Sequence, residues 1–102
     1  MRSFLLWAGR EVGLQEGRTV LGRDGSADVI VADGSVSRRH ARIEASAGDV
    51  TLEDLGSKNG TFHGETRVTS PVTLSNGDEI RLGLVTLRFV SASPEGSTLT
   101  RG

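Results

Sequence analysis

Cysteine is absent from this chain of 102 residues. Its absence excludes disulfide bonds, thiolate metal ligands and a thiol nucleophile. No hydrophobic run approaches the roughly 18 residues that are needed to cross a bilayer. The apolar stretch at residues 4–8 is also shorter than the roughly 7–15 apolar residues of a secretory signal. We therefore expect a soluble, cytoplasmic protein without direct membrane insertion.

Aromatic residues are few, and neither sign of charge is in large excess. The chain has three Phe, one Trp, no Tyr and a formal net charge of −1. Nucleic-acid-binding surfaces are typically basic and often stack bases on aromatic rings. Arg38, Arg39 and Arg42 form one local basic run, but on a strand they would divide between two faces. This composition predicts no nucleic-acid partner. With only two histidines and no cysteine, the chain also has few metal ligands, so we expect no metal site and no cofactor.

Short β-branched stretches, separated by Gly, Asn, Asp and Ser, make up most of what is present. Residues 41–45 alternate apolar and charged side chains, as expected of a half-buried strand. The predicted strands are residues 3–8, 12–15, 19–22, 29–31, 41–45, 50–54, 61–63, 66–68, 72–74, 79–82 and 85–90. Many short strands indicate an all-β sandwich or barrel. We expect one domain at residues 1–91 and a flexible tail or linker at 92–102.

Three of the predicted loops are rich in hydrogen-bond donors. Arg23 provides a planar fork of donors, Ser37 a hydroxyl and Lys58 an ammonium group. Asn59 provides both a donor and an acceptor, and can therefore bind a peptide backbone. If the loops meet in space, these groups form an anion site that suits a tetrahedral dianion better than a carboxylate. Phosphate or a phosphorylated peptide is the leading interpretation.

The order and spacing of the motifs add a family resemblance. Gly22-Arg23 is followed by Ser37-x-x-His40, then by Gly-Ser-Lys-Asn-Gly-Thr at residues 56–61, and then by Asn-Gly-Asp-x-Ile-x-Leu-Gly at residues 76–83. This ordered set resembles the forkhead-associated (FHA) domain over residues 3–90. FHA domains are phosphopeptide readers that use clustered arginines. The style of the second loop is more typical of bacterial than of eukaryotic members.

The resemblance implies a sandwich of two twisted, mainly antiparallel sheets with about eleven short strands and the binding loops at one end. The ligand would be a phosphothreonine-containing segment of a partner protein that is a substrate of a Ser/Thr protein kinase. Arg23 and Ser37 would bind the phosphate. Arg38 would contact the peptide main chain or flanking residues, and Asn59 the peptide backbone. Lys58 replaces a residue that often contacts phosphate through a hydroxyl.

Three further matched positions would support the binding loops instead of touching the ligand. They are Gly22, His40 and Gly60. The predicted function is thus a phosphothreonine-dependent adaptor module in Ser/Thr-kinase signalling, without catalysis.

Other interpretations of the same residues remain. Ser37, His40 and Asp54 could suggest a hydrolytic triad, but the chain has no Gly-x-Ser-x-Gly nucleophile elbow. A phosphorylation-independent interaction scaffold of the same fold is the alternative function. Thr98 and Thr100 lie in the expected tail and, once phosphorylated, could occupy the site in cis or in a neighbouring molecule. We expect the chain to be a module of a larger protein.

Overall fold

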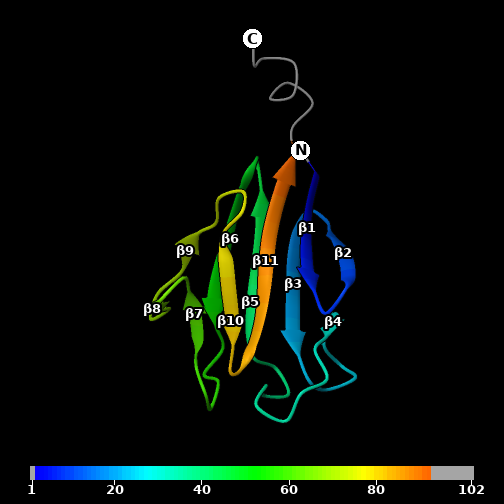
Figure 1. Ribbon diagram of the computed structural model, residues 1–102. Coiled ribbons are helices and arrows are strands. Elements are labelled where there is room, and N and C mark those ends of the chain that lie inside the picture. The colour runs from blue at the N-terminus through cyan, green and yellow to red at the C-terminus, as the bar shows by residue number, and fades with distance from the viewer. Residues whose placement is uncertain (1, 93–102) are drawn as a thin grey trace.

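The computed structural model describes residues 2–92, which form two β-sheets facing each other (Figure 1). Eleven strands make up the fold: β1 (Arg2–Trp7), β2 (Arg10–Leu14), β3 (Gly17–Gly22), β4 (Val29–Ile30), β5 (Ala41–Ser46), β6 (Asp49–Asp54), β7 (Thr61–His63), β8 (Thr66–Arg67), β9 (Val72–Thr73), β10 (Glu79–Leu82) and β11 (Val85–Ala92). The predicted all-β sandwich is confirmed. No helix in this part of the chain is long and apolar enough to cross a membrane.

One sheet has six strands in the order β2-β1-β11-β10-β7-β8, and the other has five in the order β4-β3-β5-β6-β9. Every pair is antiparallel except β3 with β4, which run parallel. The long central pairs hold the sheets together: β1 pairs with β11 from Arg2↔Ala92 to Leu6↔Arg88, and β5 pairs with β6 from Ala41↔Asp54 to Ser46↔Asp49.

All eleven predicted strands are present, and the differences lie at their ends. The second strand begins at Arg10, two residues before the predicted start, because a two-residue turn at Ala8 and Gly9 brings Arg10 opposite Trp7. Both turn residues have positive φ, 51° and 74°, as a type I′ hairpin requires. The last strand continues to Ala92, beyond the predicted end, because Arg2 pairs with it. The rest of the expected tail, with Thr98 and Thr100, lies outside the described residues.

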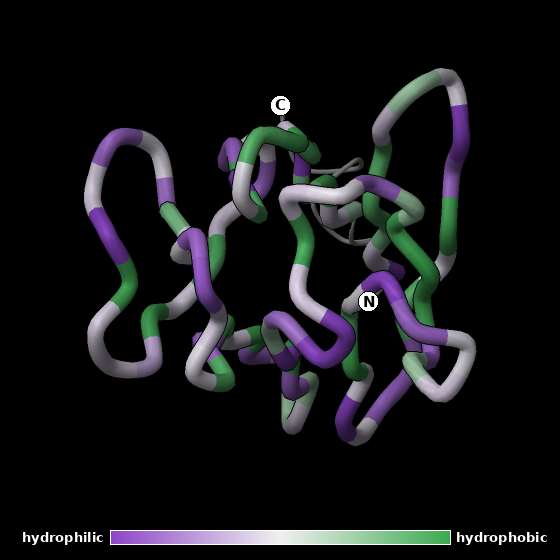
Figure 2. Tube along the Cα trace, turned by 90° about the horizontal axis from the view of Figure 1, so that it is seen from below, coloured by the Kyte–Doolittle hydropathy of each residue, from purple (hydrophilic) through white to green (hydrophobic). Residues whose placement is uncertain are grey.

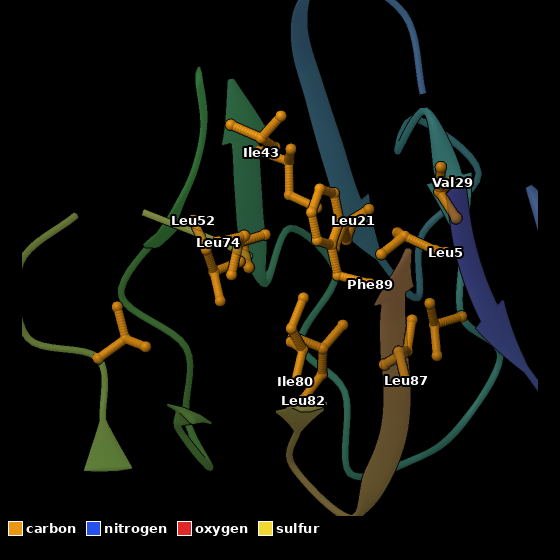
Figure 3. Packing of buried hydrophobic residues seen from close by; sticks show 14 of the residues in the cluster. Leu5, Leu21, Val29, Ile43, Leu52, Leu74, Ile80, Leu82, Leu87 and Phe89 are labelled. Carbon is orange, nitrogen blue, oxygen red and sulfur yellow. The ribbon is translucent and has the colours of Figure 1, made fainter. Parts of the chain in front are cut away.

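The hydrophobic core lies between the sheets and takes side chains from both. Leu5, Leu87 and Phe89 come from the six-stranded sheet, and Leu21 and Ile43 from the five-stranded sheet (Figure 3). Each is almost completely buried. Inward side chains alternate with outward ones along β1, β5 and β11, which is the pattern of strands with one solvated face. The sandwich therefore provides a rigid base for the loops at its ends.

The functional loops gather at one end of the sandwich, at the bottom of Figure 1. These are the segments at residues 23–28, 31–40 and 55–60, together with the tight turn between β10 and β11. The start of β1 and the end of β11 lie at the opposite end. Figure 2 views the molecule from the loop end, where hydrophilic segments are frequent in the loops.

Candidate functional site

Arg23 follows directly after β3, and its position is fixed by the segment that carries Ser37. The Arg23 main-chain N–H donates to the Ser37 carbonyl at 3.0 Å, and the Arg23 Nε–H donates to the Val36 carbonyl at 2.9 Å. The two Nη groups make no hydrogen bond within residues 2–92, and the side chain is exposed. The guanidinium is thus held through its Nε–H, and its two Nη groups are free to bind a ligand.

Gly22 permits this approach of β3 to the second loop. A Cβ atom at Gly22 would lie 1.9 Å from the Arg38 carbonyl oxygen and 2.7 Å from the Arg38 carbonyl carbon. Only glycine leaves room for the main chain of Arg38 at this distance. The Asp24 N–H then donates to the same Arg38 carbonyl at 3.2 Å. The Gly-Arg pair therefore combines close packing with placement of the cation.

His40 is completely buried and joins the three loops through main-chain groups. Its Nδ1 accepts the Ser37 N–H at 2.9 Å, and its Nε2 lies 2.9 Å from the Gly60 carbonyl. This arrangement requires the tautomer with its proton on Nε2, which then donates to Gly60. The His40 N–H donates to the Leu21 carbonyl at 2.8 Å. His40 therefore links the end of β3, the second loop and the third loop.

These contacts test whether Ser37, His40 and Asp54 form a hydrolytic triad. Both ring nitrogens of His40 bond main-chain groups, and neither forms a hydrogen bond with the Ser37 hydroxyl. The Asp54 carboxylate faces Ser57 and Thr61. A general base must reach the hydroxyl that it activates, so these three side chains do not form a triad in this structure.

Asp54 organises the third loop. Its Oδ1 accepts hydrogen bonds from the hydroxyls of Ser57, at 2.5 Å, and Thr61, at 2.6 Å. Its Oδ2 accepts the N–H groups of Gly56, at 2.9 Å, and Ser57, at 3.1 Å. Partial burial acts to raise the pKa of this carboxyl, but the hydrogen bonds from Ser57, Thr61 and Gly56 outweigh it and lower the pKa below 3.8. The carboxylate thus stays charged and holds the loop at neutral pH.

The Ser37 hydroxyl connects the second and third loops. The Lys58 main-chain N–H donates to Ser37 Oγ at 3.0 Å. Because a hydroxyl has one proton to donate in addition to its acceptor lone pairs, this contact leaves the Ser37 O–H proton available to a ligand. Ser37 is half-buried, and Lys58 is exposed.

Asn59 also bridges the two loops, through its side chain. Its Nδ2 donates to the Ser35 carbonyl at 2.8 Å, which leaves the amide oxygen as an acceptor. Gly60 follows with φ of +92° and is buried. A Cβ at Gly60 would lie 3.1 Å from Phe62 Cε1 and 3.3 Å from Arg67 Cζ, so both its conformation and its surroundings favour glycine.

The loop end carries four exposed cations: Arg23, Arg38, Arg39 and Lys58. Among the described residues, none of the four forms an ion pair within 4.0 Å. The nearby acid Asp24 is turned toward its own loop: hydrogen bonds from the Ser26 hydroxyl and N–H lower its pKa, and the charges of Arg38 and Arg23 add to that effect. The cationic groups are therefore available to an anion.

The structure thus brings Arg23, Ser37, Arg38, Lys58 and Asn59 to one end of the sandwich, with Gly22, His40 and Gly60 beneath them. Sequence reasoning missed the residues that hold the loops: Ser35, Asp54 as a loop anchor, Ser57 and Thr61. An Asp followed three residues later by Ser is a local signal for such a side-chain-capped turn, and Asp54-x-x-Ser57 carries it. Ser35 has a local signal only for its hydrogen bonds to Asp33, two residues before it. Its other partners, Asn59 and Leu84, are distant in sequence.

Comparison with known proteins decides the family. The model of the FHA domain matches residues 19–83. This is more than half of the chain and runs from within β3 to the end of β10, with the loops between them. This chain belongs to the FHA domain family. The resemblance inferred from the ordered motifs is confirmed.

Several bacterial relatives share this domain. The chain is 39% identical over 88 residues to an oxoglutarate dehydrogenase inhibitor of Corynebacterium jeikeium, covering 86% of this chain and 60% of the relative. It is 38% identical over 84 residues to the glycogen accumulation regulator GarA of Mycolicibacterium smegmatis, covering 82% of this chain and 52% of GarA. The FHA domain described here thus spans about half the length of these relatives, or slightly more.

A solved FHA domain known for phosphothreonine-dependent interactions has the same architecture. It superimposes on this chain with a TM-score of 0.87 and 32% sequence identity, covering 91% of this chain and 99% of the other. The agreement extends over both sheets, since 91% of this chain includes nearly all of residues 2–92.

Proposed function

We propose that this FHA domain is a binding module, without catalysis, that recognises phosphothreonine in a partner's peptide segment and acts as an adaptor in Ser/Thr-kinase signalling. The observation that carries the proposal is the pairing of Arg23 with Ser37. The Arg23 main-chain N–H donates to the Ser37 carbonyl and the Arg23 Nε–H to the Val36 carbonyl, so the guanidinium is held against the segment that carries Ser37. The Arg23 Nη groups and the Ser37 O–H proton have no acceptor within residues 2–92. A phosphate dianion uses such a set of donors fully.

The remaining exposed groups suit the rest of a phosphopeptide. The Lys58 main-chain N–H is bonded to Ser37 Oγ, which places Lys58 next to the proposed phosphate site. Its ammonium group therefore adds positive charge there. The Asn59 amide oxygen can accept a peptide N–H, since its Nδ2 is fixed to Ser35. Arg38 extends the cationic surface toward the flanking residues. Gly22, His40 and Gly60 keep these groups in place without touching the ligand.

Phosphothreonine is favoured as the ligand by the related FHA domain whose interactions depend on that residue. The partner would be a substrate of a Ser/Thr kinase, and the relatives named as an inhibitor and a regulator are consistent with a signalling role.

The number of contacts predicts a reversible complex. Charge-assisted hydrogen bonds contribute roughly 1.5–3 kcal/mol each, so three or four to the phosphate and one or two to the backbone give on the order of 6–18 kcal/mol. Association and ordering of the peptide cost at least ~4 kcal/mol. The middle of that range, about 12 kcal/mol, then leaves about 8 kcal/mol, which corresponds to a Kd of about one micromolar.

Calorimetric titration with three degenerate peptide pools tests the proposal. The pools contain phosphothreonine, phosphoserine or unphosphorylated threonine at the fixed position. We expect heat of binding from the phosphothreonine pool and none from the unphosphorylated pool. Binding that is equal for all pools would contradict the proposal and favour a phosphorylation-independent scaffold. Silence from all three pools with a folded sample would contradict it as well.

A further inference from the structure

The strand β2 is an open edge of the six-stranded sheet. In the described part of the chain the edge strands of the two sheets are β2, β8, β4 and β9, and the last three have only two residues each. Short edge strands protect a sheet against pairing with another chain. β2 has five residues, with neither proline nor lysine among them. It is therefore the edge to which a further strand can be added.

The register of the hairpin shows which main-chain groups of β2 are free. A two-residue turn joins β1 to β2, so Trp7 and Arg10 form the hydrogen-bonded pair next to the turn. Hydrogen-bonded and non-hydrogen-bonded pairs alternate along an antiparallel ladder, so Val12 also bonds to β1. The N–H and C=O groups of Glu11 and Gly13 then point away from β1. No hydrogen bond from the loops or turns of residues 2–92 reaches them.

Glycine at position 13 is not required by the fold itself. Gly13 is not among the glycines with positive φ, and a Cβ there would lie 4.0 Å from Phe4 Cδ1, which is an ordinary van der Waals contact. Glycine in the interior of a strand weakens that strand, and it often marks a place where another chain approaches closely. The missing side chain at Gly13 leaves open space on the outer face of the sheet, beside the Phe4 ring.

On the same outer face lie two charges without a partner of opposite sign. Glu11 is exposed, and the Arg2 guanidinium lies 5.4 Å from the centre of the Phe4 ring. Neither charge forms an ion pair within residues 2–92. On the outer face of the five-stranded sheet, by contrast, arginines and glutamates are paired with each other: Arg18 with Glu44 and Arg42 with Glu53.

We propose that β2 pairs antiparallel with β2 of a second copy of this chain, about a two-fold axis at Val12, so that the two six-stranded sheets become one continuous sheet. Glu11 of each copy then lies opposite Gly13 of the other, and each such pair exchanges both of its main-chain hydrogen bonds. Because Gly13 has no side chain, Glu11 extends across it toward Arg2 of the other copy. The same patch serves on both copies, so the association closes at a dimer.

The core-facing side of β2 adds apolar contact to this pairing. A groove between β2 and β4 is lined in part by Trp7, Val12, Val29 and Ile30, and Ile30 is 45% exposed. In the proposed register the Val12 side chains of the two copies meet beside this groove. The β1–β2 hairpin alone supplies the carboxylate, the gap and the arginine, so its best-matched partner is another copy of itself. The antiparallel pairing directs the two loop ends in opposite directions and leaves both free.

Sedimentation velocity of the whole chain, at concentrations from about 10 µM to 1 mM, tests the dimer. Pairing of one short strand per copy is a small interface, so we expect a reversible dimer with a Kd between about 10 µM and 1 mM. Glu11→Arg should raise that Kd at least about tenfold, because it brings like charges together at both ends of the paired strands. The double variant Arg2→Glu with Glu11→Arg restores opposite charges, and its Kd should return to within about threefold of the wild-type value.

Glu65→Arg is the matched control for net charge. Glu65 is also exposed and has no ion pair within residues 2–92, but it lies in the turn between β7 and β8, at the other edge of the same sheet. This variant should dimerise as the wild type does. Amide hydrogen exchange then locates the contact: the Glu11 and Gly13 amides should become more protected as the concentration rises, whereas the Val12 amide is already bonded to β1.

The outcomes separate the dimer from the proposed function. A wild-type chain that stays monomeric at 1 mM would overturn the dimer. A dimer with the same Kd in wild type and Glu11→Arg, or one that protects amides on another strand, would overturn it as well. Glu11 and Gly13 lie outside the binding loops, so Glu11→Arg should bind the phosphothreonine peptide pool as the wild type does. Failure of that pool to bind would overturn the proposed function and leave the dimer standing.

Discussion

The Lys58 main-chain N–H donates to the Ser37 hydroxyl oxygen at 3.0 Å, across 21 positions of sequence. The contact uses one acceptor lone pair of the hydroxyl and leaves its proton available to an anion. It also means that the third loop contributes to the site through its backbone as well as through its side chains.

Replacing Ser37 by alanine should weaken binding of a phosphothreonine peptide by about ten- to a hundredfold, the value of one hydrogen bond to a charged group. The fold should remain, because the Lys58 N–H is exposed and water can replace the lost acceptor. Calorimetry gives the affinity, and thermal unfolding followed by circular dichroism gives the stability. Ser70→Ala, at an exposed serine outside the loop end, is the control. Equal affinity in Ser37→Ala and wild type would contradict the assigned role.

The sequence is informative for the strands because alternation of apolar and polar residues is a local property. Residues 61–63 and 79–82 are predicted with their observed ends. Hairpin turns are harder to predict where alanine takes a positive φ, as at Ala8 and Ala47, with φ of 51° and 53°. There the pairing of the flanking strands determines a conformation that alanine alone disfavours.

For the candidate site too, local motifs can be predicted from the sequence, whereas contacts between distant segments cannot. Arg23, Ser37 and Asn59 can be proposed from the order and spacing of the motifs, which lie within the residues that match the family model. Contacts such as Ser35 with Leu84, which are 49 positions apart, depend on how the two sheets pack. No local pattern encodes that packing, so the role of Ser35 becomes visible only in the structure.

Gly22→Ala should both destabilise the domain and weaken phosphopeptide binding. A Cβ 1.9 Å from the Arg38 carbonyl oxygen forces the second loop away from β3 and breaks the Arg23–Ser37 main-chain hydrogen bond. Overpacking of this kind costs about 1–3 kcal/mol, and more where the backbone must move. Urea unfolding measures the change in the free energy of unfolding. Gly25→Ala is the control, because nothing lies within 4 Å of its Cβ position. Equal stability of the two variants would show that the loop adjusts without cost.

Asp54→Asn should destabilise the domain by about 1–3 kcal/mol at pH 7, because the amide has only one acceptor oxygen for two hydroxyls and two N–H groups. The pKa of Asp54 is lowered in the folded protein, so its contribution is present above the ordinary value of 3.8 and declines as the pH falls below it. The gap between wild type and variant should thus narrow in urea unfolding below pH 3.8.

Asp49→Asn is the control for this pH dependence. Asp49 lies on the same strand, β6, is exposed, and has no side-chain hydrogen bond within residues 2–92. The free energy of unfolding of Asp49→Asn should equal that of the wild type at every pH. A difference between Asp54→Asn and wild type that is constant down to pH 2 would contradict the charge-dependent role of Asp54.

Lys58 and Arg23 should differ in how much they contribute to phosphate binding. Two hydrogen bonds orient the Arg23 backbone and guanidinium, whereas only the Lys58 main chain is fixed, and its ammonium is exposed. Lys58→Ala keeps that main-chain contact and should weaken a phosphothreonine peptide by about two- to fivefold, in line with an exposed charge pair. Arg23→Ala should cost at least about tenfold. Calorimetry at 50 mM and 500 mM salt separates the two, because the contribution of an exposed ammonium is screened at high salt while that of an oriented, hydrogen-bonded fork persists. Equal losses for both variants at both salt concentrations would show that the ammonium is held at the phosphate as firmly as the guanidinium.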